Sequence, residues 1–410
     1  MPLAPSAFHA YPLVTLVTAG IGQRASTARP QSGVARGREP RGAVSPQGST
    51  PWMIFEIPNN SVIRRLGDWA ADSFLRFTGT QRFLVAQLDV TNACNLRCAH
   101  CYHPHHVNNG ALALSDWRNI LDQYAALIAR LRLKPYFVLC GGEPTLSPLY
   151  IPLLEELDHR WPGVTVAITT NGTALTPALL AKSARFNLAY QISLDGPDAP
   201  RHDAIRGDGA FDEAATGLKN LQSAGLNANL LATLSFRSAG WIDDFFATGR
   251  RTGAAAMNFV RFISQGSGRK MADAGQDRPL TAQELHKAYS SILAASKATE
   301  IRTNTDHPLY CLIDENVGSH GLMGFQGIVI DYRGNLKVSS RTEPVLGNVL
   351  NEGLENLFLR HPTMRQLRRG RIEVCGSCVY YTRCGGDRNA AFAETGSFFS
   401  KDPGCWLPDA

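Results

Sequence analysis

The most constraining feature of the sequence is an alternation of short apolar runs with longer amphipathic segments, which begins near Phe83. The short runs have the length and composition of β-strands, and the segments between them have the period of α-helices. We expect strands at 83–90, 136–140, 164–169, 188–194, 227–235 and 256–263. We expect helices at 115–131, 148–160, 177–185, 211–224 and 239–251.

Strand–helix alternation of this kind builds a parallel sheet, because parallel neighbours need a long crossover and helices usually supply it. The six expected units are fewer than the eight that close a full barrel. The sequence therefore predicts an α/β fold over residues 83–270, an open or partial (β/α)6 barrel of TIM type.

The segments on either side of this barrel have a different character. Residues 1–52 are rich in Pro, Gly, Ser, Ala and Arg, and no basic residue precedes their apolar stretch as a secretory signal requires. Such an arginine-rich, acid-poor leader could be a transit peptide, but we expect a disordered or non-native leader. Residues 53–82 would form an N-terminal lead-in, and 271–320 a linker with one helix at 281–297.

The last segment, 321–410, contains a hairpin pattern at 327–336 and then becomes rich in cysteine and aromatic residues with little periodicity. Hydrophobic burial alone would not hold such a loop-rich region, so we expect a metal or cluster to staple it.

Composition limits the possible functions. A hydrophobic content of 44% allows a large core, and no run of eighteen apolar residues suggests a membrane-spanning helix. The net charge is +6, of which residues 1–52 account for +4 and the rest of the chain for +2. This near-neutral balance does not favour nucleic-acid binding, so we expect neither a nucleic-acid nor a membrane partner.

The nine cysteines are an odd number in a long chain, which argues against a disulfide framework and favours a reducing, cytoplasmic location. Cys94, Cys98 and Cys101 form a C-x3-C-x2-C array directly after the first expected strand. Three thiolates on one loop can hold an iron–sulfur cluster with one iron left open. Zinc is the alternative, with a fourth ligand from a group of nearby histidines. These are His100, His103, His105 and His106.

Further motifs follow the next three expected strands in order. Gly141-Gly142-Glu143-Pro144 follows the second strand, Thr169-Thr170-Asn171-Gly172 the third, and Ser193-Leu194-Asp195-Gly196-Pro197 the fourth, with His202-Asp203 and Arg206 beyond. Together with the cysteine loop, this series resembles the radical S-adenosylmethionine (SAM) superfamily. Its members carry such motifs at the carboxyl ends of the strands, where barrel enzymes assemble their sites.

The resemblance implies cofactors and roles. Cys94, Cys98 and Cys101 would hold a 4Fe–4S cluster, and SAM would chelate its open iron. Reductive cleavage of SAM would give a 5′-deoxyadenosyl radical that abstracts a hydrogen atom from the substrate. Glu143 would accept a hydrogen bond from the methionyl amine, and no catalytic residue beyond the cluster is assigned. The predicted SAM-binding residues are Tyr102, Gly141, Gly142, Glu143, Ser193 and Arg206.

A second cysteine group resembles the SPASM extension found behind many radical SAM enzymes that modify peptides or proteins. Its four thiolates would saturate an auxiliary 4Fe–4S cluster, and a four-cysteine zinc site is the alternative. Cys140 and Cys311 stay outside both groups and are expected to be packed thiols. The group consists of Cys375, Cys378, Cys384 and Cys405.

This chain departs from the SPASM pattern, which has a further cysteine where Arg388 stands. Other positions where the family places ligands near the hairpin are also occupied by residues that do not ligate iron. We therefore expect one auxiliary cluster where the pattern has two. These positions are Leu322, Met323, Ser339 and Ser340.

The sequence thus predicts a cytoplasmic radical SAM enzyme of oxidoreductase or maturase type. Its substrate would be a peptide or protein, or a small molecule such as a tetrapyrrole or an amino sugar, and ferredoxin or flavodoxin would donate electrons. The competing hypotheses are a zinc-stabilised Cys/His-rich binding protein and a pure electron carrier.

Overall fold

The computed structural model describes residues 83–103, 106–318, 323–325 and 327–408. The expected leader (1–52) and lead-in (53–82), together with His105 and Leu322, lie outside the described residues.

Six parallel strands form the wall of a partial barrel, and the order across the sheet is β6-β5-β4-β3-β2-β1. Each coincides with an expected strand, and the ends differ by at most two residues. The predicted α/β partial barrel is therefore confirmed. The strands are β1 (Phe83–Thr91), β2 (Lys134–Gly141), β3 (Val166–Thr170), β4 (Leu188–Ser193), β5 (Ala228–Leu234) and β6 (Ala256–Arg261).

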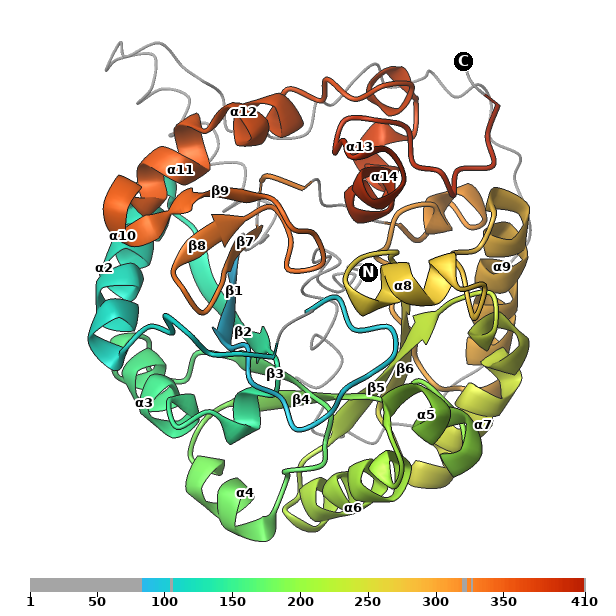
Figure 1. Ribbon diagram of the computed structural model, residues 1–410, viewed down its shortest axis with the longest axis horizontal. Helices are drawn as coiled ribbons and strands as arrows, with labels where there is room; N and C mark the ends of the chain where they lie inside the picture. Colours follow the sequence, from blue (N-terminus) through green and yellow to red (C-terminus); the bar gives the residue numbers. More distant parts are fainter. Residues whose placement is uncertain (1–82, 104–105, 319–322, 326, 409–410) are drawn as a thin grey trace, which may run out of the picture.

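Helices cover the outer face of this wall in a ring (Figure 1). The helix α2 shows why they pack there: Trp117, Ile120, Leu121 and Tyr124 recur at helical spacing and are all buried. The Tyr124 hydroxyl also donates to the carbonyl of Leu84 in β1, at 2.5 Å. The ring contains α2 (Leu114–Leu131), α3 (Tyr150–Arg160), α4 (Pro177–Ser183), α5 (Ala199–Arg206), α6 (Ala210–Ser223) and α7 (Ile242–Thr252).

Helix α5 was not among the expected helices. It begins because the Asp198 side chain accepts a hydrogen bond from the Arg201 amide and a proline stands in its first turn. The Asp203 carboxylate accepts hydrogen bonds from the amides of Gly209 and Phe211, at 2.9 and 2.8 Å. It thereby joins α5 to the start of α6.

The predicted hairpin is present and extends the same sheet. Strand β7 (Gly327–Ile330) pairs in parallel with β1, and β8 (Asn335–Lys337) and β9 (Val345–Asn348) follow antiparallel. The C-terminal hairpin thus pairs with an edge of the barrel that would otherwise be open.

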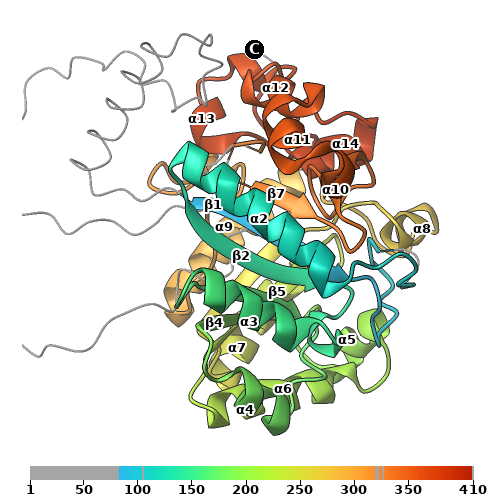
Figure 2. The same ribbon diagram turned by 90° about the vertical axis from the view of Figure 1, so that its left-hand side faces the viewer.

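The remaining helices fill the gap between the two ends of the barrel wall. Helix α9 (Ala282–Thr299) packs on α7, and α11 (Leu354–Arg360) packs on α2. Figure 2 shows α10–α14 gathered on one side and α3–α7 on the other, with α2 and β7 between them. The other helices are α8 (Ser267–Asp273), α10 (Val349–Glu352), α12 (Pro362–Arg368), α13 (Tyr381–Cys384) and α14 (Arg388–Thr395). Short 3-10 turns lie at η1 (Pro144–Leu146), η2 (Ser238–Trp241), η3 (Tyr310–Leu312) and η4 (Cys375–Ser377).

Across the described ranges, no helix combines the length and apolar character needed to cross a membrane.

One close contact ties α6 to the loop after β3. A Cβ atom on Gly217 would lie 2.1 Å from the carbonyl oxygen of Gly172, so only glycine fits there. We expect Gly217→Ala to lower the free energy of unfolding by about 1–3 kcal/mol, because the backbone of the β3 loop would have to move. Urea unfolding followed by circular dichroism measures the loss.

Gly240→Ala is the matched control, since no atom lies within 4 Å of a Cβ built at Gly240. Equal losses in the two variants would show that the tight contact at Gly217 does not matter for stability.

Candidate functional site

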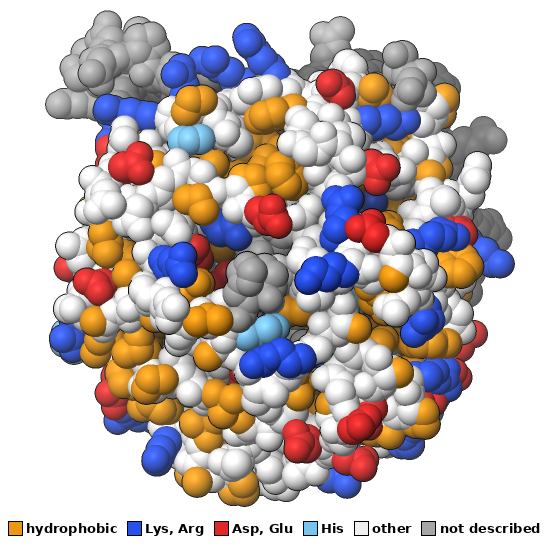
Figure 3. Space-filling model, in the orientation of Figure 1, with side chains coloured by type: hydrophobic (Ala, Val, Ile, Leu, Met, Phe, Trp, Pro, Cys, Tyr) orange, Lys and Arg blue, Asp and Glu red, His pale blue; other side chains and the backbone are white. Residues whose placement is uncertain are grey.

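The carboxyl ends of the barrel strands surround a cavity of about 270 Å³. Its wall contains residues from the loop after β1, from the ends of β2 to β6, and from the C-terminal part of the chain. On the face shown in Figure 3, the basic and acidic side chains of the described residues are mixed with one another. The predicted site residues that line the cavity are Cys94, Cys98, Cys101, Tyr102, Gly141, Gly142, Ser193, Arg206 and, from the second cysteine group, Cys384.

The cysteine loop is fixed to the end of β2 by its backbone. The amide of Gly142 donates to the carbonyl of Thr91 at 2.7 Å, and the amide of Glu143 donates to that of Ala93 at 2.9 Å. A Cβ on Gly141 would lie 2.2 Å from the Thr91 oxygen, and one on Gly142 would lie 2.2 Å from the Ala93 oxygen. The prediction linked these glycines to a ligand, whereas the structure shows that the approach of the cysteine loop already requires them.

Glu143 is fully buried, and its side chain is not among the cavity-lining groups. Its carboxylate accepts hydrogen bonds from the Thr145 hydroxyl at 2.5 Å, the Thr170 hydroxyl at 2.7 Å and the Asn171 amide at 2.7 Å. Burial raises the pKa of this carboxyl above its ordinary value. Through these partners the Glu143 carboxylate joins β2 to the loop after β3. Its predicted contact with the methionyl amine stays a prediction.

Polar side chains lie beside two of the three sulfurs. The Asn171 amide nitrogen is 3.9 Å from the Cys94 sulfur, and a guanidinium nitrogen of Arg206 is 3.9 Å from the Cys98 sulfur. Asn171 follows β3, and Arg206 ends α5, the helix after the β4 motif. The structure therefore places residues of the β3 and β4 motifs next to the cysteine loop that follows β1.

Asp195 holds Arg206 in this position. Its carboxylate accepts hydrogen bonds from Arg206 at 2.6 Å and from the Thr233 amide at 2.7 Å, and it lies 2.8 Å from His100 Nε2. Burial opposes the charge on Asp195, yet Arg206 and His100 hold the pKa of this carboxyl well below its usual value. The sequence motif contained Asp195 but gave it no role, and its place at the end of β4 was the available signal.

The three loop thiols are suited to metal binding only once they lose their protons. Burial raises the pKa of Cys98 to about 11 and also raises those of Cys94 and Cys101. A bound metal supplies the positive charge that stabilises thiolates. In the part of the chain that is described, no three His, Cys, Asp or Glu side chains are close enough to hold a single metal ion. A four-iron cluster is wider than one ion, so three thiols on one cavity wall fit its donor set.

The second cysteine group also comes together. Cys375, Cys378, Cys384 and Cys405 all line one small cavity between α13 and the end of the chain. The backbone amide of Leu309 donates to the Cys384 sulfur at 3.3 Å. Four thiols around one space match the donor set of a saturated cluster, whereas among the described residues no three of them are close enough for one zinc ion.

The two remaining cysteines are buried, as expected for packed thiols. Cys140 lies at the end of β2, and Cys311 lies in the turn η3. The thiol of Cys311 is hydrogen-bonded to that of Cys384, which lowers its pKa. Cys311 therefore adjoins the second cysteine group, a position that its isolated place in the sequence did not reveal.

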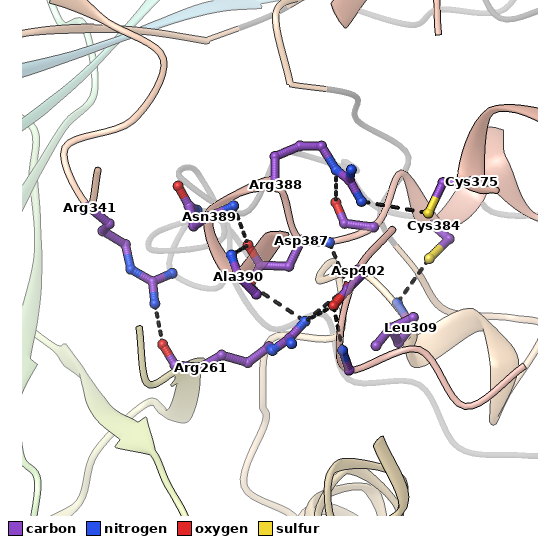
Figure 4. A network of polar contacts seen from close by, with 12 residues as sticks. Arg261, Leu309, Arg341, Cys375, Cys384, Asp387, Arg388, Asn389, Ala390 and Asp402 are labelled. Carbon is purple, nitrogen blue, oxygen red and sulfur yellow. Dashed lines mark hydrogen bonds and ion pairs between the residues drawn. The ribbon is translucent and has the colours of Figure 1, made fainter. Parts of the chain in front are cut away.

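Arg388 occupies the position of the missing SPASM cysteine and is almost fully buried. Its guanidinium donates to the carbonyls of Gly386, Phe398 and Ser400, at 3.2, 3.2 and 2.6 Å. A further nitrogen lies 3.6 Å from the sulfur of Cys375 (Figure 4). A cation thus stands beside the retained cysteine group. The other substituted positions, Met323, Ser339 and Ser340, line the main cavity.

Arg261 connects the barrel to the cysteine-rich part of the chain. From the end of β6 it donates two hydrogen bonds of 2.9 Å to the carboxylate of Asp402, which is fully buried. The Asp402 carboxylate also accepts a hydrogen bond from the Asp387 amide at 2.7 Å, as Figure 4 shows. In this buried ion pair a single guanidinium nitrogen, Nη1, faces both carboxylate oxygens. A charge-assisted contact of this kind fixes the position of the C-terminal part against the cavity.

Comparison with known proteins agrees with this geometry. Residues 88–237 match the Radical SAM superfamily. Over 335 residues the chain is 30% identical to the mycofactocin maturase MftC of Mycobacterium ulcerans, an alignment covering 77% of this chain and 86% of that protein. The chain belongs to the radical SAM superfamily. It is also 25% identical over 342 residues to the AdoMet-dependent heme synthase of Nitratidesulfovibrio vulgaris, covering 77% of this chain and 90% of the relative.

Solved structures share the fold. SuiB of Streptococcus suis bound to its precursor peptide SuiA aligns with a TM-score of 0.64 and 15% identity, covering 84% of this chain and 81% of SuiB. The enzyme anSMEcpe with bound AdoMet aligns with a TM-score of 0.62 and 15% identity, covering 78% and 94% of the two chains. The chain is therefore a radical SAM enzyme with a SPASM-type C-terminal domain, and the predicted use of SAM and a 4Fe–4S cluster is confirmed. The zinc-stabilised binding protein and the pure electron carrier are not supported.

The role of the loop thiols can be tested by removing them together. We expect a variant with Cys94, Cys98 and Cys101 all replaced by Ala to lose 5′-deoxyadenosine formation and to keep roughly half of its iron, at the second cysteine group. Iron quantification and product analysis after anaerobic reconstitution measure both.

Cys140→Ala is the control, because Cys140 lines the same cavity without belonging to the loop. It should keep all of the iron. Product formation by the triple variant would refute the ligand assignment.

His202 makes stability depend on pH. The ring is fully buried, and within the described residues neither ring nitrogen has a hydrogen-bond partner. Burial and then Arg206 lower the pKa of His202 to about 4, against the opposite effect of Asp195 and Asp203. An unfolded histidine takes up its proton near pH 6.5, so folding stability falls as the pH drops from about 6.5 to about 4.

We expect His202→Gln to remove about 2 kcal/mol of the stability difference between pH 7 and pH 5. Urea unfolding of both proteins at the two pH values measures it. An unchanged difference would mean that His202 is not held neutral in the fold.

Proposed function

We propose that this enzyme binds the SAM-cleaving 4Fe–4S cluster through Cys94, Cys98 and Cys101 and modifies a peptide substrate in the cavity beside it. The observation that carries the assignment is the meeting of the cysteine loop with the strand-end motifs on one cavity wall. The bound cluster and SAM would supply a 5′-deoxyadenosyl radical able to take a hydrogen atom from the substrate.

The residues of the chain would bind and orient SAM. Tyr102, Gly141, Gly142 and Ser193 line the cavity and offer a ring, close backbone approach and a hydroxyl. Arg206, fixed by the buried Asp195, is positioned beside the loop sulfurs and can form two parallel hydrogen bonds to a carboxylate. Glu143 would hold the loop after β3 and would accept a hydrogen bond from the methionyl amine. These groups would also keep water from the reacting atoms.

The second cysteine group would hold an auxiliary 4Fe–4S cluster. Four thiolates from Cys375, Cys378, Cys384 and Cys405 leave no coordination site open, so the cluster would stabilise this region or relay electrons. Reduction would require a donor such as ferredoxin or flavodoxin. We also propose the division into a barrel (83–270), a linker with one helix (271–320) and the auxiliary-cluster domain (321–410), although β7 of the last part pairs with the barrel sheet.

Among the candidate substrates, a peptide has the stronger support from the relatives. The mycofactocin relatives are named maturases, and SuiB has been seen bound to a precursor peptide. A tetrapyrrole is the second candidate, because other relatives are named heme synthases and an Fe-coproporphyrin III synthase.

The experiment uses anaerobically reconstituted enzyme with SAM and dithionite. We expect 5′-deoxyadenosine even without substrate, and faster formation together with a mass shift when the correct peptide is present. Short peptides encoded next to the gene form one arm of the assay, and coproporphyrin III with bound iron forms the other. A protein that holds zinc and no iron, or that yields no 5′-deoxyadenosine, would contradict the proposed chemistry. A product only from the porphyrin arm would replace the peptide with a tetrapyrrole.

A further inference from the structure

Four arginines among the described residues line the main cavity, and they differ in the partners of their guanidinium groups. Arg206 has the carboxylate of Asp195 as a partner, and Arg261 has that of Asp402. Arg388 donates to three backbone carbonyls. The fourth, Arg341, follows Ser339 and Ser340 in the loop between β8 and β9.

Among the described residues, the one hydrogen-bond acceptor found for the Arg341 guanidinium is the backbone carbonyl of Arg261, and no carboxylate lies within ion-pair distance. A guanidinium carries five N–H donors, so most of its donors remain for a bound group. Burial lowers the pKa of Arg341, and the opposing attraction of Asp387, which is not within ion-pair distance, does not balance the desolvation of its charge. A cation held in a cavity in this way favours an anionic ligand.

Among the described residues that line the cavity, one side chain is acidic, that of Asp387, and it is already engaged. Asp387 lies 3.7 Å from Arg261 and accepts hydrogen bonds from the amides of Asn389 and Ala390, which begin α14 (Figure 4). The wall therefore presents Arg341 to any anion that enters, without an internal competitor within ion-pair distance.

Arg341 is also next to the reacting end of the cavity. Tyr102, which follows the last loop cysteine, is hydrogen-bonded to Ser340, the residue that precedes Arg341, and both Tyr102 and Arg341 line the cavity. On the same wall, the buried Oδ1 atom of Asn389 has no partner among the described residues and could accept an N–H from the ligand.

We propose that Arg341 is the receptor for a carboxylate of the substrate. The two N–H groups of one guanidinium edge match the two oxygens of a carboxylate. Such a contact would hold the substrate by its charged end while an adjacent carbon faces the cysteine loop. The inference rests on the proposed function, since it names the chemical class of the group that this cavity selects. The carboxylate could belong to a peptide or to a side chain of a tetrapyrrole.

The test measures whether binding depends on the substrate charge. Two pairs of probes are titrated calorimetrically into anaerobic holoenzyme with SAM. One pair is N-acetyl-Ala-Ala-Phe as the free acid and as the C-terminal amide, and the other is coproporphyrin III and its tetramethyl ester. We expect the wild type to bind the acid of at least one pair about tenfold more tightly than the neutral form. The pair that shows the preference identifies the source of the carboxylate.

Substitution then assigns the preference to one residue. Arg341→Gln should reduce the acid-to-neutral affinity ratio to about one, and Arg341→Lys should restore part of it, because an ammonium keeps the charge without the planar fork. A loss of packing alone would weaken both members of a pair equally and leave the ratio unchanged. Arg333→Gln is the matched control, since Arg333 lies in the β7–β8 turn of the same hairpin and does not line the cavity.

A ratio near one in the wild type for both pairs would overturn the inference, and so would a ratio that survives in Arg341→Gln. The proposed function is tested separately by 5′-deoxyadenosine formation in the same wild-type preparation. If that product forms but no acid is preferred, only the role of Arg341 is refuted. If it does not form, the proposed function itself fails.

Discussion

The site depends on a backbone contact between the cysteine loop and the end of β2. The carbonyls of Thr91 and Ala93 accept the amides of Gly142 and Glu143, and side chains at the two glycines would push the loop away. The path of the loop is thus set by hydrogen bonds and by the absence of two Cβ atoms, before any cofactor binds. Glu143 adds a second connection, because its buried carboxylate accepts hydrogen bonds from Thr170 and Asn171 at the end of β3. Preorganisation of this kind lets three thiols share one cavity wall.

A second constraint comes from the open side of the barrel. Six strands leave a gap, and the chain closes it with elements that follow the barrel in sequence. The β7–β8 hairpin pairs with β1, while Arg261 at the end of β6 binds the buried Asp402 near the end of the chain. One edge of the barrel is therefore joined by strand pairing and the other by a buried ion pair. This closure makes the cysteine-rich part a wall of the main cavity, where its side chains can select the substrate.

Local patterns predicted much of this arrangement. The periods of the apolar residues were sufficient to predict the six strands and most helices of the barrel. The strand-end motifs predicted where the cavity lies, because parallel strands end on the same side of the barrel. Features that depend on distant partners were missed. Helix α5 is short and mostly polar, the parallel pairing of β7 with β1 joins segments far apart in the sequence, and Asp195 acquires its importance only from Arg206 and His100. The internal partners of Glu143 were also beyond what a motif can reveal.

The positions at which this chain departs from the SPASM pattern share a location in the structure. The positions without cluster ligands, Ser339, Ser340 and Arg388, lie on the wall of the main cavity. Two of the side chains in this region are guanidiniums, Arg341 and Arg388, and they differ in what surrounds them. Arg388 is enclosed by carbonyls and touches the retained cysteine group, so its charge acts on the protein itself. Arg341 keeps most of its donors for the cavity. Where the SPASM pattern has iron ligands, the cavity wall of this chain thus has two serines and a guanidinium, with Arg341 directly beside the serines. The proposed role of Arg341 would let this wall select substrates by charge.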